Sequence, residues 1–353
     1  MKYGLNGNGL FIIVLVTFLI STFLVPIVKK IAFHVNAIDY PNERKVHAKP
    51  MPRLGGLAIF LAFLTGYMLF AQEMKGMLGI IMGGFLLLLI GIFDDINPMS
   101  ARYKLIGQII AASVAVFYGE VLLQNISAFG IYIDFGGISP VITVLFIVTL
   151  INAINLIDGL DGLSGGISSI YFGTIIVISF LLNKTTGLDM MISLLMLGSI
   201  LGYLVHNFPP AKIFMGDSGS MFIGYMISIV ALLGFKNVTL TSLIVPILIL
   251  AIPIIDTILA IFRRFINNKP IGEADKNHIH HQFLKMKFST RKTILIIYVI
   301  NIIFSAISVF YVMGYNREAI IIYIIMMAVL FLFVLKTSVL YDKSSLKNVN
   351  QKE

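Results

Sequence analysis

Eleven apolar runs constrain this chain more than any other feature of its sequence. Of its 353 residues, 58% are hydrophobic and 12% are charged, whereas soluble domains carry about 25% charged residues. A helix needs about 20 apolar residues to cross a bilayer, so each run is a candidate transmembrane helix. The runs cover residues 9–28, 55–71, 77–93, 105–119, 139–157, 163–182, 188–206, 219–235, 240–262, 293–313 and 318–340. We therefore predict an all-α polytopic membrane protein with eleven transmembrane helices, forming a single domain over residues 1–353.

Lysine and arginine residues lie mainly between alternate runs, which predicts the orientation in the membrane. With an external N-terminus, all but five of the 26 basic residues lie on the cytoplasmic side, as the positive-inside rule requires. The exceptions are Lys2, Lys75, Lys184, Lys236 and Arg317. The C-terminus is then cytoplasmic, and the net charge of +9 needs no nucleic-acid partner to explain it. The chain has no cysteine, which excludes thiolate metal sites and a cysteine nucleophile.

The segment NAINLIDGLDGLSGG follows directly on the apolar run VITVLFIVTLI and carries four polar side chains. They are Asn152, Asn155, Asp158 and Asp161. Burying polar and ionisable groups inside or at the edge of a transmembrane helix costs free energy, so such groups by default mark a functional site. Amide and carboxylate oxygens are ligands for Mg²⁺, and a carboxylate is also a base for proton transfer. We expect Gly159 and Gly162 to break the helix, so that the aspartates turn into a common cleft.

Two further acidic motifs are predicted on the same membrane face. Asp94 and Asp95 end the third run, where the negative end of the helix dipole disfavours carboxylates, so a structural role is a poor explanation for them. Lys104 opens the next run and is a candidate phosphate ligand. Asp217 lies between glycines at the start of the eighth run, where a helix N-terminus favours phosphate. A simple helix cap stays open for Asp217.

Basic loops supply candidate anion ligands. The proline-rich loop DYPNERKVHAKPMPRLGG contains Arg44, His47 and Arg53. The longest loop, 263–292, contains three histidines among arginines and lysines, a setting that suits hydrogen bonds to a diphosphate or nucleotide. They are His278, His280 and His281. Zinc binding and plain solvated loops stay open as alternatives. Asp256, inside the ninth run after Pro253, has no role that the sequence assigns.

Five of these segments occur in an order that resembles a known family. RKVHAKPMPRLGG, FDDINP, NAINLIDGLDGL, FMGDSGS and ADKNHIHHQF are similar to motifs of the polyprenyl-phosphate N-acetylaminosugar-1-phosphate transferases, and the resemblance extends from Asp39 to about Phe283. The HIHH segment resembles the branch that uses UDP-N-acetylglucosamine, and in particular the Gram-positive enzymes that begin wall teichoic acid synthesis. The resemblance implies transfer of a sugar 1-phosphate from a UDP-sugar to undecaprenyl phosphate at the cell membrane, with release of UMP.

The resemblance also implies a cytoplasm-facing active site and a role for each residue. The site would be built from loops 29–54, 94–104, 152–166, 207–219 and 263–292. Asp217 and Asn155 would hold Mg²⁺, for which Mn²⁺ is an expected substitute. Asp94 would accept the proton of the lipid phosphate or orient it, Asp95 would support Asp94, and Asp158 and Asp161 would shape the nucleotide and metal pocket. The substrate ligands would be Arg44, His47, Arg53, Lys104, Asn152, His278, His280 and His281.

Several alternatives stay open at this point. Within the enzyme class, the chain could be a phospho-N-acetylmuramoyl-pentapeptide transferase of peptidoglycan synthesis. From other classes, a secondary transporter would place its polar groups near the bilayer midplane and show repeat symmetry, and a lipid-binding scaffold would not need the acidic motifs. Direct attack by the lipid phosphate is favoured over a two-step route with an aspartyl nucleophile. A homodimer is compatible with the sequence.

Overall fold

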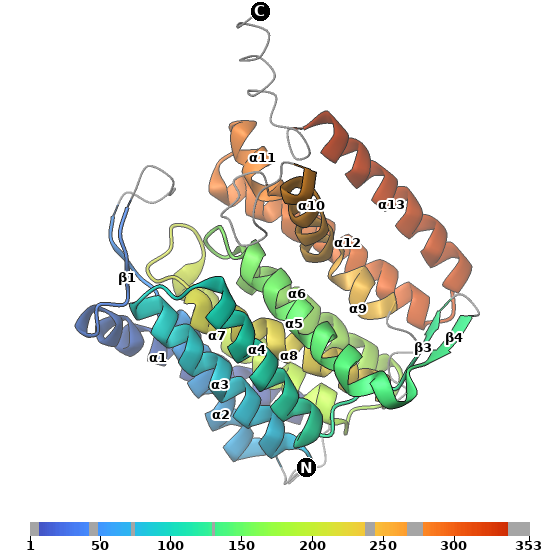
Figure 1. Ribbon diagram of the computed structural model, residues 1–353, viewed down its shortest axis with the longest axis horizontal. Coiled ribbons are helices and arrows are strands. Elements are labelled where there is room, and N and C mark those ends of the chain that lie inside the picture. Colours follow the sequence, from blue (N-terminus) through green and yellow to red (C-terminus); the bar gives the residue numbers. More distant parts are fainter. Residues whose placement is uncertain are drawn as a thin grey trace, which may run out of the picture. The chain divides into compact units, whose positions relative to one another are not determined.

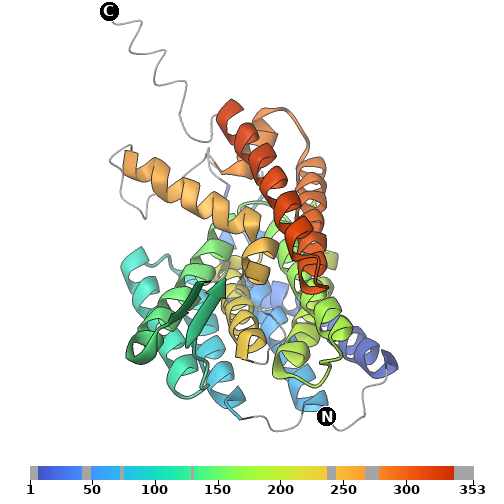
Figure 2. The same cartoon turned by 90° about the vertical axis from the view of Figure 1, so that its right-hand side faces the viewer.

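The computed structural model describes residues 7–41, 49–71, 75–128, 131–236, 244–266 and 278–337. It is almost entirely helical (Figures 1 and 2). The chain divides into two compact units, Met1–Pro246 and Ile247–Glu353. The expectation of one domain over residues 1–353 stays a prediction. Arg44 and His47, which we expect to bind substrate, lie outside the described residues.

The first unit is a helical bundle with two short hairpins. Its helices are α1 (Gly7–His34), α2 (Gly55–Phe70), α3 (Met77–Ile96), α4 (Ala101–Phe117), α5 (Ser139–Ile157), α6 (Leu163–Leu181), α7 (Leu188–Asn207) and α8 (Gly216–Lys236). Strands β1 (Ile38–Asp39) and β2 (Met51–Pro52) pair antiparallel between α1 and α2. Strands β3 (Asn125–Ala128) and β4 (Ile131–Asp134) form a second antiparallel hairpin before the 3₁₀ turn η1 (Gly136–Ile138) and α5.

Helix α8 forms the centre of this bundle. Its sequence, GDSGSMFIGYMISIVALLGFK, is apolar or small on every side after the first turn, the pattern of a helix that is buried all round. Its described side chains are almost all buried, and α2, α3, α5 and α7 pack against it. Any polar group at the first turn of α8 is therefore held inside a ring of neighbouring helices.

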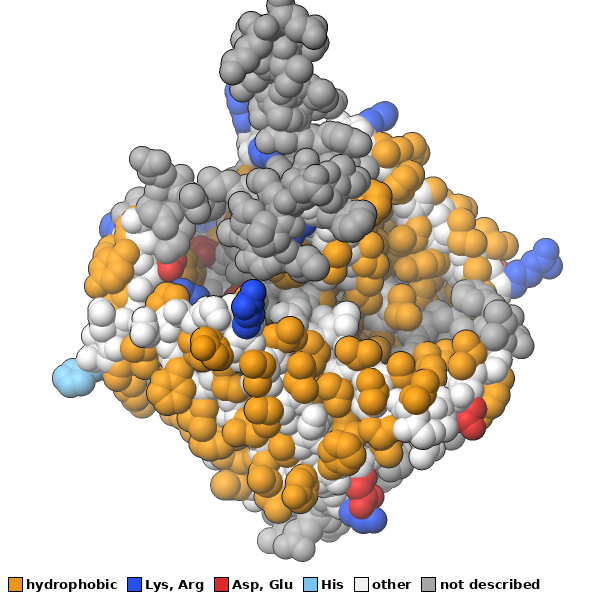
Figure 3. Space-filling view, in the orientation of Figure 1, with side chains coloured by type: hydrophobic (Ala, Val, Ile, Leu, Met, Phe, Trp, Pro, Cys, Tyr) orange, Lys and Arg blue, Asp and Glu red, His pale blue; other side chains and the backbone are white. Residues whose placement is uncertain are grey.

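Small residues let the outer helices approach closely, as is usual where lipid supplies no hydrophobic driving force for helix association. Gly198 and Gly202 lie one turn apart on α7, where it packs on α1. A Cβ atom at Gly198 would overlap Thr17, and one at Gly202 would overlap the carbonyl of Phe18. The outer face over α3, α4 and α5 is mainly apolar (Figure 3), as lipid contact requires.

The second unit contains α10 (Ala251–Ile266), α11 (Ile279–Lys285), α12 (Thr290–Val312) and α13 (Asn316–Lys336). The long helices α12 and α13 pack on one another, and both α10 and α11 contact α12. The short α9 (Ile244–Ile249) lies at the boundary between the units. The hydroxyl of Ser289 caps α12 by accepting the backbone N–H of Lys292 at 3.3 Å.

The all-α polytopic class is confirmed, with shorter helices at three of the eleven predicted runs. Among the described residues, eight helices are long and apolar enough to cross a membrane: α1, α3, α5, α6, α7, α8, α12 and α13. Runs 55–71 and 105–119 form α2 and α4, of 16 and 17 residues. Run 240–262 is divided between α9 and α10. Pro253 has no N–H to donate back to Ile249, which accounts for the interruption there.

Candidate active site

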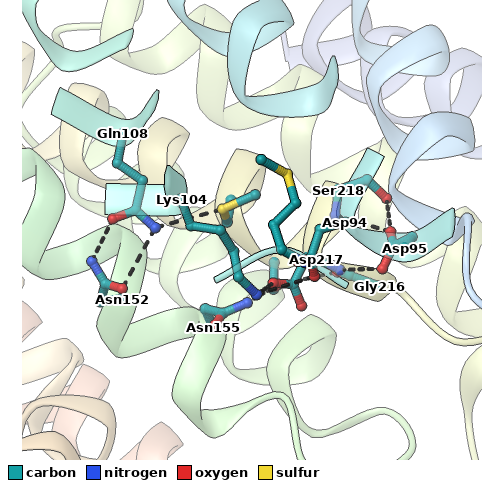
Figure 4. A network of polar contacts seen from close by, with 12 residues as sticks. Asp94, Asp95, Lys104, Gln108, Asn152, Asn155, Gly216, Asp217 and Ser218 are labelled. Atoms are coloured by element: carbon teal, nitrogen blue, oxygen red, sulfur yellow. Dashed lines mark hydrogen bonds and ion pairs between the residues drawn. The ribbon is translucent and has the colours of Figure 1, made fainter. Parts of the chain in front are cut away.

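Three carboxylates meet where the end of α3 lies against the start of α8 (Figure 4). Asp94 and Asp95 belong to the last turn of α3, and Asp217 belongs to the first turn of α8. One ligand oxygen from each lies within 4.8 Å of the others. We call these three residues the acidic centre. The motifs FDDINP and FMGDSGS therefore lie against one another in the structure.

Asp95 joins the two helices by capping α8. One of its carboxylate oxygens, Oδ1, accepts the backbone N–H of Asp217 at 2.9 Å. The other, Oδ2, accepts the N–H of Ser218 at 3.2 Å and its hydroxyl at 2.8 Å. The first N–H groups of a helix have no partner within it, and the positive end of the dipole favours a carboxylate there. Asp95 thus holds the backbone that carries Asp217.

This contact requires glycine at two positions. Gly216 has a φ of +73°, a conformation that glycine adopts without strain. A Cβ atom there would overlap the Asp95 carboxylate and the carbonyl of Arg53. Gly91, one turn before Asp95 on α3, faces the backbone of Ser218 with no room for a side chain.

Two cations balance the acidic centre. Lys104, in the first turn of α4, places its Nζ 2.8 Å from Asp217 and 3.1 Å from Asp94. The guanidinium of Arg53 lies 3.3 Å from Asp95 and 3.6 Å from Asp217. Burial by itself would lower the pKa of Arg53, but the carboxylates of Asp95 and Asp217 outweigh it and raise the pKa. Each cation therefore bridges two carboxylates of the acidic centre, and Arg53 also lies 3.5 Å from Asp39.

The remaining oxygen of Asp94 organises the turn between α3 and α4. Its Oδ1 accepts the backbone N–H of Met99 at 2.7 Å, while Oδ2 faces Lys104. Those two donors offset the unfavourable dipole at the end of α3. The loop N–H and Lys104 thus hold Asp94 at the edge of the acidic centre.

The motif at the end of α5 contributes one side chain directly to the acidic centre. The Nδ2 amide of Asn155 donates to the Ser220 hydroxyl at 2.8 Å, and its side chain also hydrogen bonds Asp217. With Nδ2 serving as the donor, the carbonyl oxygen of Asn155 is the atom suited to a cation. The predicted pair of Asp217 and Asn155 is therefore adjacent in the structure.

Asn152 lies one turn away and faces a different partner. Its Nδ2 donates to Gln108 Oε1 at 2.7 Å, and Gln108 returns a longer contact of 3.5 Å (Figure 4). Gln108 is buried on α4, four residues after Lys104. The amide pair clamps α4 to α5. Sequence reasoning missed Gln108, although its spacing from Lys104 puts both side chains on one helix face.

The predicted break after α5 is confirmed and separates the two aspartates of the motif. α5 ends at Ile157, Gly162 has a φ of +76°, and α6 begins at Leu163. Asp158 hydrogen bonds Ser164. Burial, followed by the nearby Asp217 carboxylate, raises the pKa of Asp158 to about 7. Asp158 therefore titrates near neutral pH beside the acidic centre.

Asp161 acts on the segment that leads into α8. Its Oδ2 accepts the backbone N–H of Ala211 at 3.0 Å. Asn207, which sequence reasoning missed, accepts the N–H of Gly162 and donates to the carbonyl of Ile213, both at 2.8 Å. These contacts tie the turn after α5 to the loop before Asp217.

That loop also pairs with the segment that carries Arg53. The N–H of Phe214 donates to Pro52, and the N–H groups of Gly55 and Gly56 donate to Phe214 and Met215. The three hydrogen bonds are 2.8–2.9 Å long. Strand-like pairing thus fixes Arg53 beside Gly216, although the two segments are far apart in the sequence.

The three predicted histidines belong to the second unit and are described within it. His278 precedes α11, and His280 and His281 lie in its first turn. The rings of His278 and His280 stack with centroids 5.7 Å apart, and the ring of His281 is tilted against His280 with centroids 4.3 Å apart. Burial, and then neighbouring His281, lowers the pKa of His280 to about 3, so His280 is neutral at physiological pH. We call these three residues the histidine cluster.

The chain is similar in sequence to known proteins over most of its length. Residues 77–235 match the family described as glycosyl transferase family 4. The chain is 42% identical over 298 residues to a probable undecaprenyl-phosphate N-acetylglucosaminyl 1-phosphate transferase of Bacillus subtilis, covering 84% of this chain and 82% of that relative. The chain belongs to glycosyl transferase family 4.

More distant members of the family align over a similar length. A decaprenyl-phosphate N-acetylglucosaminephosphotransferase of Mycolicibacterium smegmatis is 33% identical, covering 84% of this chain and 80% of its own. An undecaprenyl-phosphate alpha-N-acetylglucosaminyl 1-phosphate transferase of Haemophilus influenzae is 32% identical, covering 86% and 88%. The family resemblance predicted from the five motifs is confirmed, and this glycosyl transferase family 4 member is a multi-pass membrane transferase.

The acidic centre of this family 4 transferase fits a hard divalent cation. Its donors are carboxylate oxygens, with the amide oxygen of Asn155 alongside, and Mg²⁺ prefers oxygen ligands. Among the described residues, this is the group of acidic or histidine side chains whose ligand atoms come together closely enough for one ion. A soft, sulfur-binding metal has no matching donor, since the chain lacks cysteine.

Proposed function

We propose that this family 4 transferase moves N-acetylglucosamine 1-phosphate from UDP-N-acetylglucosamine to undecaprenyl phosphate. The products are UMP and undecaprenyl-diphospho-N-acetylglucosamine, the first intermediate of teichoic acid or a related cell-envelope polysaccharide. The observation that carries the proposal is the acidic centre bridged by Lys104 and Arg53, an arrangement suited to two phosphate-bearing substrates. The names of the relatives, which join a polyprenyl phosphate to N-acetylglucosamine phosphate, support the same substrates.

The reaction requires only positioning and charge neutralisation. An oxygen of the lipid phosphate attacks the sugar-bearing phosphorus of the donor, and a new phosphorus–oxygen bond forms. The bond from that phosphorus to the bridging oxygen breaks, and its electron pair leaves with UMP. A phosphate monoester is already an anionic nucleophile at neutral pH, so direct attack needs no aspartyl intermediate. Catalysis of this kind is mainly electrostatic.

The residues of the acidic centre divide the work. Asp217 and the amide oxygen of Asn155 would hold Mg²⁺, which when bound neutralises charge on the diphosphate. Lys104 is placed to bind a phosphate oxygen, because its ammonium already faces two acidic oxygens. Asp94, hydrogen bonded to Lys104, orients the lipid phosphate or accepts its remaining proton. Asp95 supports Asp94 and Asp217 by joining the end of α3 to the start of α8.

The same contacts support a common membrane face for the site. Asp94 ends one span, Asp217 begins another, and Asp158 follows a third. Because these groups lie together, the three helix ends share one side of the bilayer. Loops rich in lysine and arginine face the cytoplasm, so we infer that this side is cytoplasmic, with the N-terminus outside and the C-terminus inside. We therefore place the active site at the cytoplasmic face of the cell membrane, with undecaprenyl phosphate reaching it from the inner leaflet. The resemblance to enzymes that begin wall teichoic acid synthesis favours a Gram-positive source.

Neither competing function has comparable support. A transporter would need its polar groups near the middle of the bilayer, whereas the acidic centre lies at helix ends. None of the relatives named above is described as a muramoyl-pentapeptide transferase, and all of their names refer to N-acetylglucosamine.

A donor-specificity assay tests the proposal. Purified protein in lipid nanodiscs is mixed with Mg²⁺, undecaprenyl phosphate and either UDP-N-acetylglucosamine or UDP-N-acetylmuramoyl-pentapeptide. We expect UMP release with the first donor and none with the second. Release with the muramoyl donor alone would overturn the substrate assignment. The mass of the same particles also tests whether the enzyme is a homodimer.

A further inference from the structure

The sequence leaves Asp256 without a role, and the structure gives it two partners. Asp256 lies on α10 and is 3% exposed. Its Oδ2 is 2.8 Å from Nδ1 of His278, and its Oδ1 accepts the backbone N–H of Ile279 at 2.9 Å. Both partners lie at the beginning of α11, more than twenty residues further along the chain. A carboxylate this deeply buried requires such donors.

The hydrogen bond between Asp256 and His278 determines which nitrogen of the His278 ring can contact a ligand. An ionised carboxylate only accepts hydrogen bonds, so Nδ1 of His278 must carry the proton that it donates to Asp256. The tautomer of a histidine is set by the hydrogen bond that one nitrogen makes, which decides the state of the other. Here the second nitrogen, Nε2, is the atom left to meet a ligand. The stacked ring of His280 further restricts rotation of His278.

We propose that Asp256 is a positioning residue that fixes the ring and the Nδ1–H form of His278, so that Nε2 is presented to the UDP-sugar. The inference rests on the proposed function and on the role that the family resemblance implies for the histidine cluster, which is to bind the UDP-sugar. Asp256 has no contact with substrate in this scheme. It acts only through His278, while its bond to Ile279 anchors the start of α11.

Replacing Asp256 by asparagine separates these two contacts. The two contacts use different carboxylate oxygens, and asparagine has an acceptor oxygen at only one of these positions, so one contact loses its acceptor. If the oxygen keeps Ile279, the new NH₂ group faces Nδ1 and forces the proton to Nε2. Removing a carboxylate that orients a metal-binding histidine costs about 10- to 100-fold, and we take this as the scale for His278. We expect a loss of that size in kcat/KM for Asp256→Asn.

A double-mutant cycle shows whether Asp256 acts through His278. His278→Asn keeps a donor near Asp256 but removes Nε2, so it should lower kcat/KM at least as far as Asp256→Asn does. The loss should divide between kcat and KM in the same way in the two variants. In the His278→Asn background, Asp256→Asn should lower kcat/KM by less than about threefold more, because no imidazole ring is then left for Asp256 to orient. Equal losses in both backgrounds, or wild-type activity in Asp256→Asn, would overturn the proposal.

Two further measurements keep the test independent of folding and of the transferase assignment. Thr257→Val alters the next buried residue of α10 and should retain wild-type kcat and KM. In wild-type protein labelled with ¹⁵N-histidine, the signal lost in His278→Asn should report a protonated Nδ1. A ring protonated on Nε2 alone would contradict the proposal whatever the variants do. If wild-type protein released no UMP with either donor, the proposed function would be wrong. The NMR signal of His278 would still show whether Nδ1 carries the proton that is donated to Asp256.

Discussion

The acidic centre and the histidine cluster are held in opposite ways. In the acidic centre, Lys104, Arg53 and Asp217 each pair with at least two opposite charges, and Arg53 and Lys104 keep 26% and 25% of their side chains exposed. In the histidine cluster, a single carboxylate holds a single ring, and both side chains are at most 6% exposed. A network of partly exposed charges can exchange partners with incoming ions, whereas a buried pair is set before substrate arrives. The comparison suggests that the first region carries the charge of the reaction and the second fixes an orientation.

The largest expected effect tests the acidic centre as the seat of the reaction. Asp217→Asn should lower kcat by about 10³-fold or more, because charge stabilisation by a bound metal is worth several kcal/mol. UMP release and the melting temperature should be measured together, with Asp134→Asn on β4 as a control that makes the same substitution away from the acidic centre. Wild-type turnover in Asp217→Asn would contradict the metal assignment.

A smaller loss of activity is expected when Lys104, the cation proposed to bind a phosphate oxygen, is replaced. Lys104→Gln removes the ammonium shared by Asp94 and Asp217 and should lower kcat/KM about 10²-fold, the scale for one electrostatic donor in an active site. Lys75→Gln, which affects an exposed ion pair with Glu120, is the matched control. Steady-state kinetics would refute the assignment if both variants behaved alike.

The close contact between α3 and α8 at Gly216 can be disrupted by a substitution that changes no charged residue. Gly216→Ala should destabilise the protein by about 1–2 kcal/mol from its left-handed backbone alone, and activity should fall with the displaced Asp95. Gly137→Ala has open space around the new Cβ and should leave thermal stability and UMP release unchanged. Equal melting temperatures for the two variants would show that the α3–α8 contact tolerates a side chain.

The smallest effect is a pH dependence of stability from Asp158. Its folded pKa of about 7 lies above the ordinary value of 3.8, so the folded state binds more protons between these values. Its contribution to stability is therefore largest below about pH 4 and declines as the pH rises to 7. Without added metal, the melting temperature of Asp158→Asn relative to wild type should rise across this interval. A constant difference would place the Asp158 pKa near its ordinary value.

Much of the acidic centre was predictable because polar groups in apolar runs stand out. Asp94, Asp217 and Asn155 each interrupt or border a hydrophobic segment, and the structure brings all three together. Asn152 belongs to the same motif, yet it pairs with Gln108 on another helix. Nothing in the local pattern distinguishes these two asparagines. The difference comes from which helix faces each turn of α5.

The hydrophobic pattern of the sequence by itself determined that this chain is a helical membrane protein, because a lipid environment admits few other arrangements of so apolar a chain. Its polar interruptions also identified the acidic motifs. Only the tertiary structure decided that Asp95 caps α8 and that Asp256 holds His278. These are single contacts between distant segments. They leave no periodic signal in the sequence, since their geometry exists only after the helices have packed.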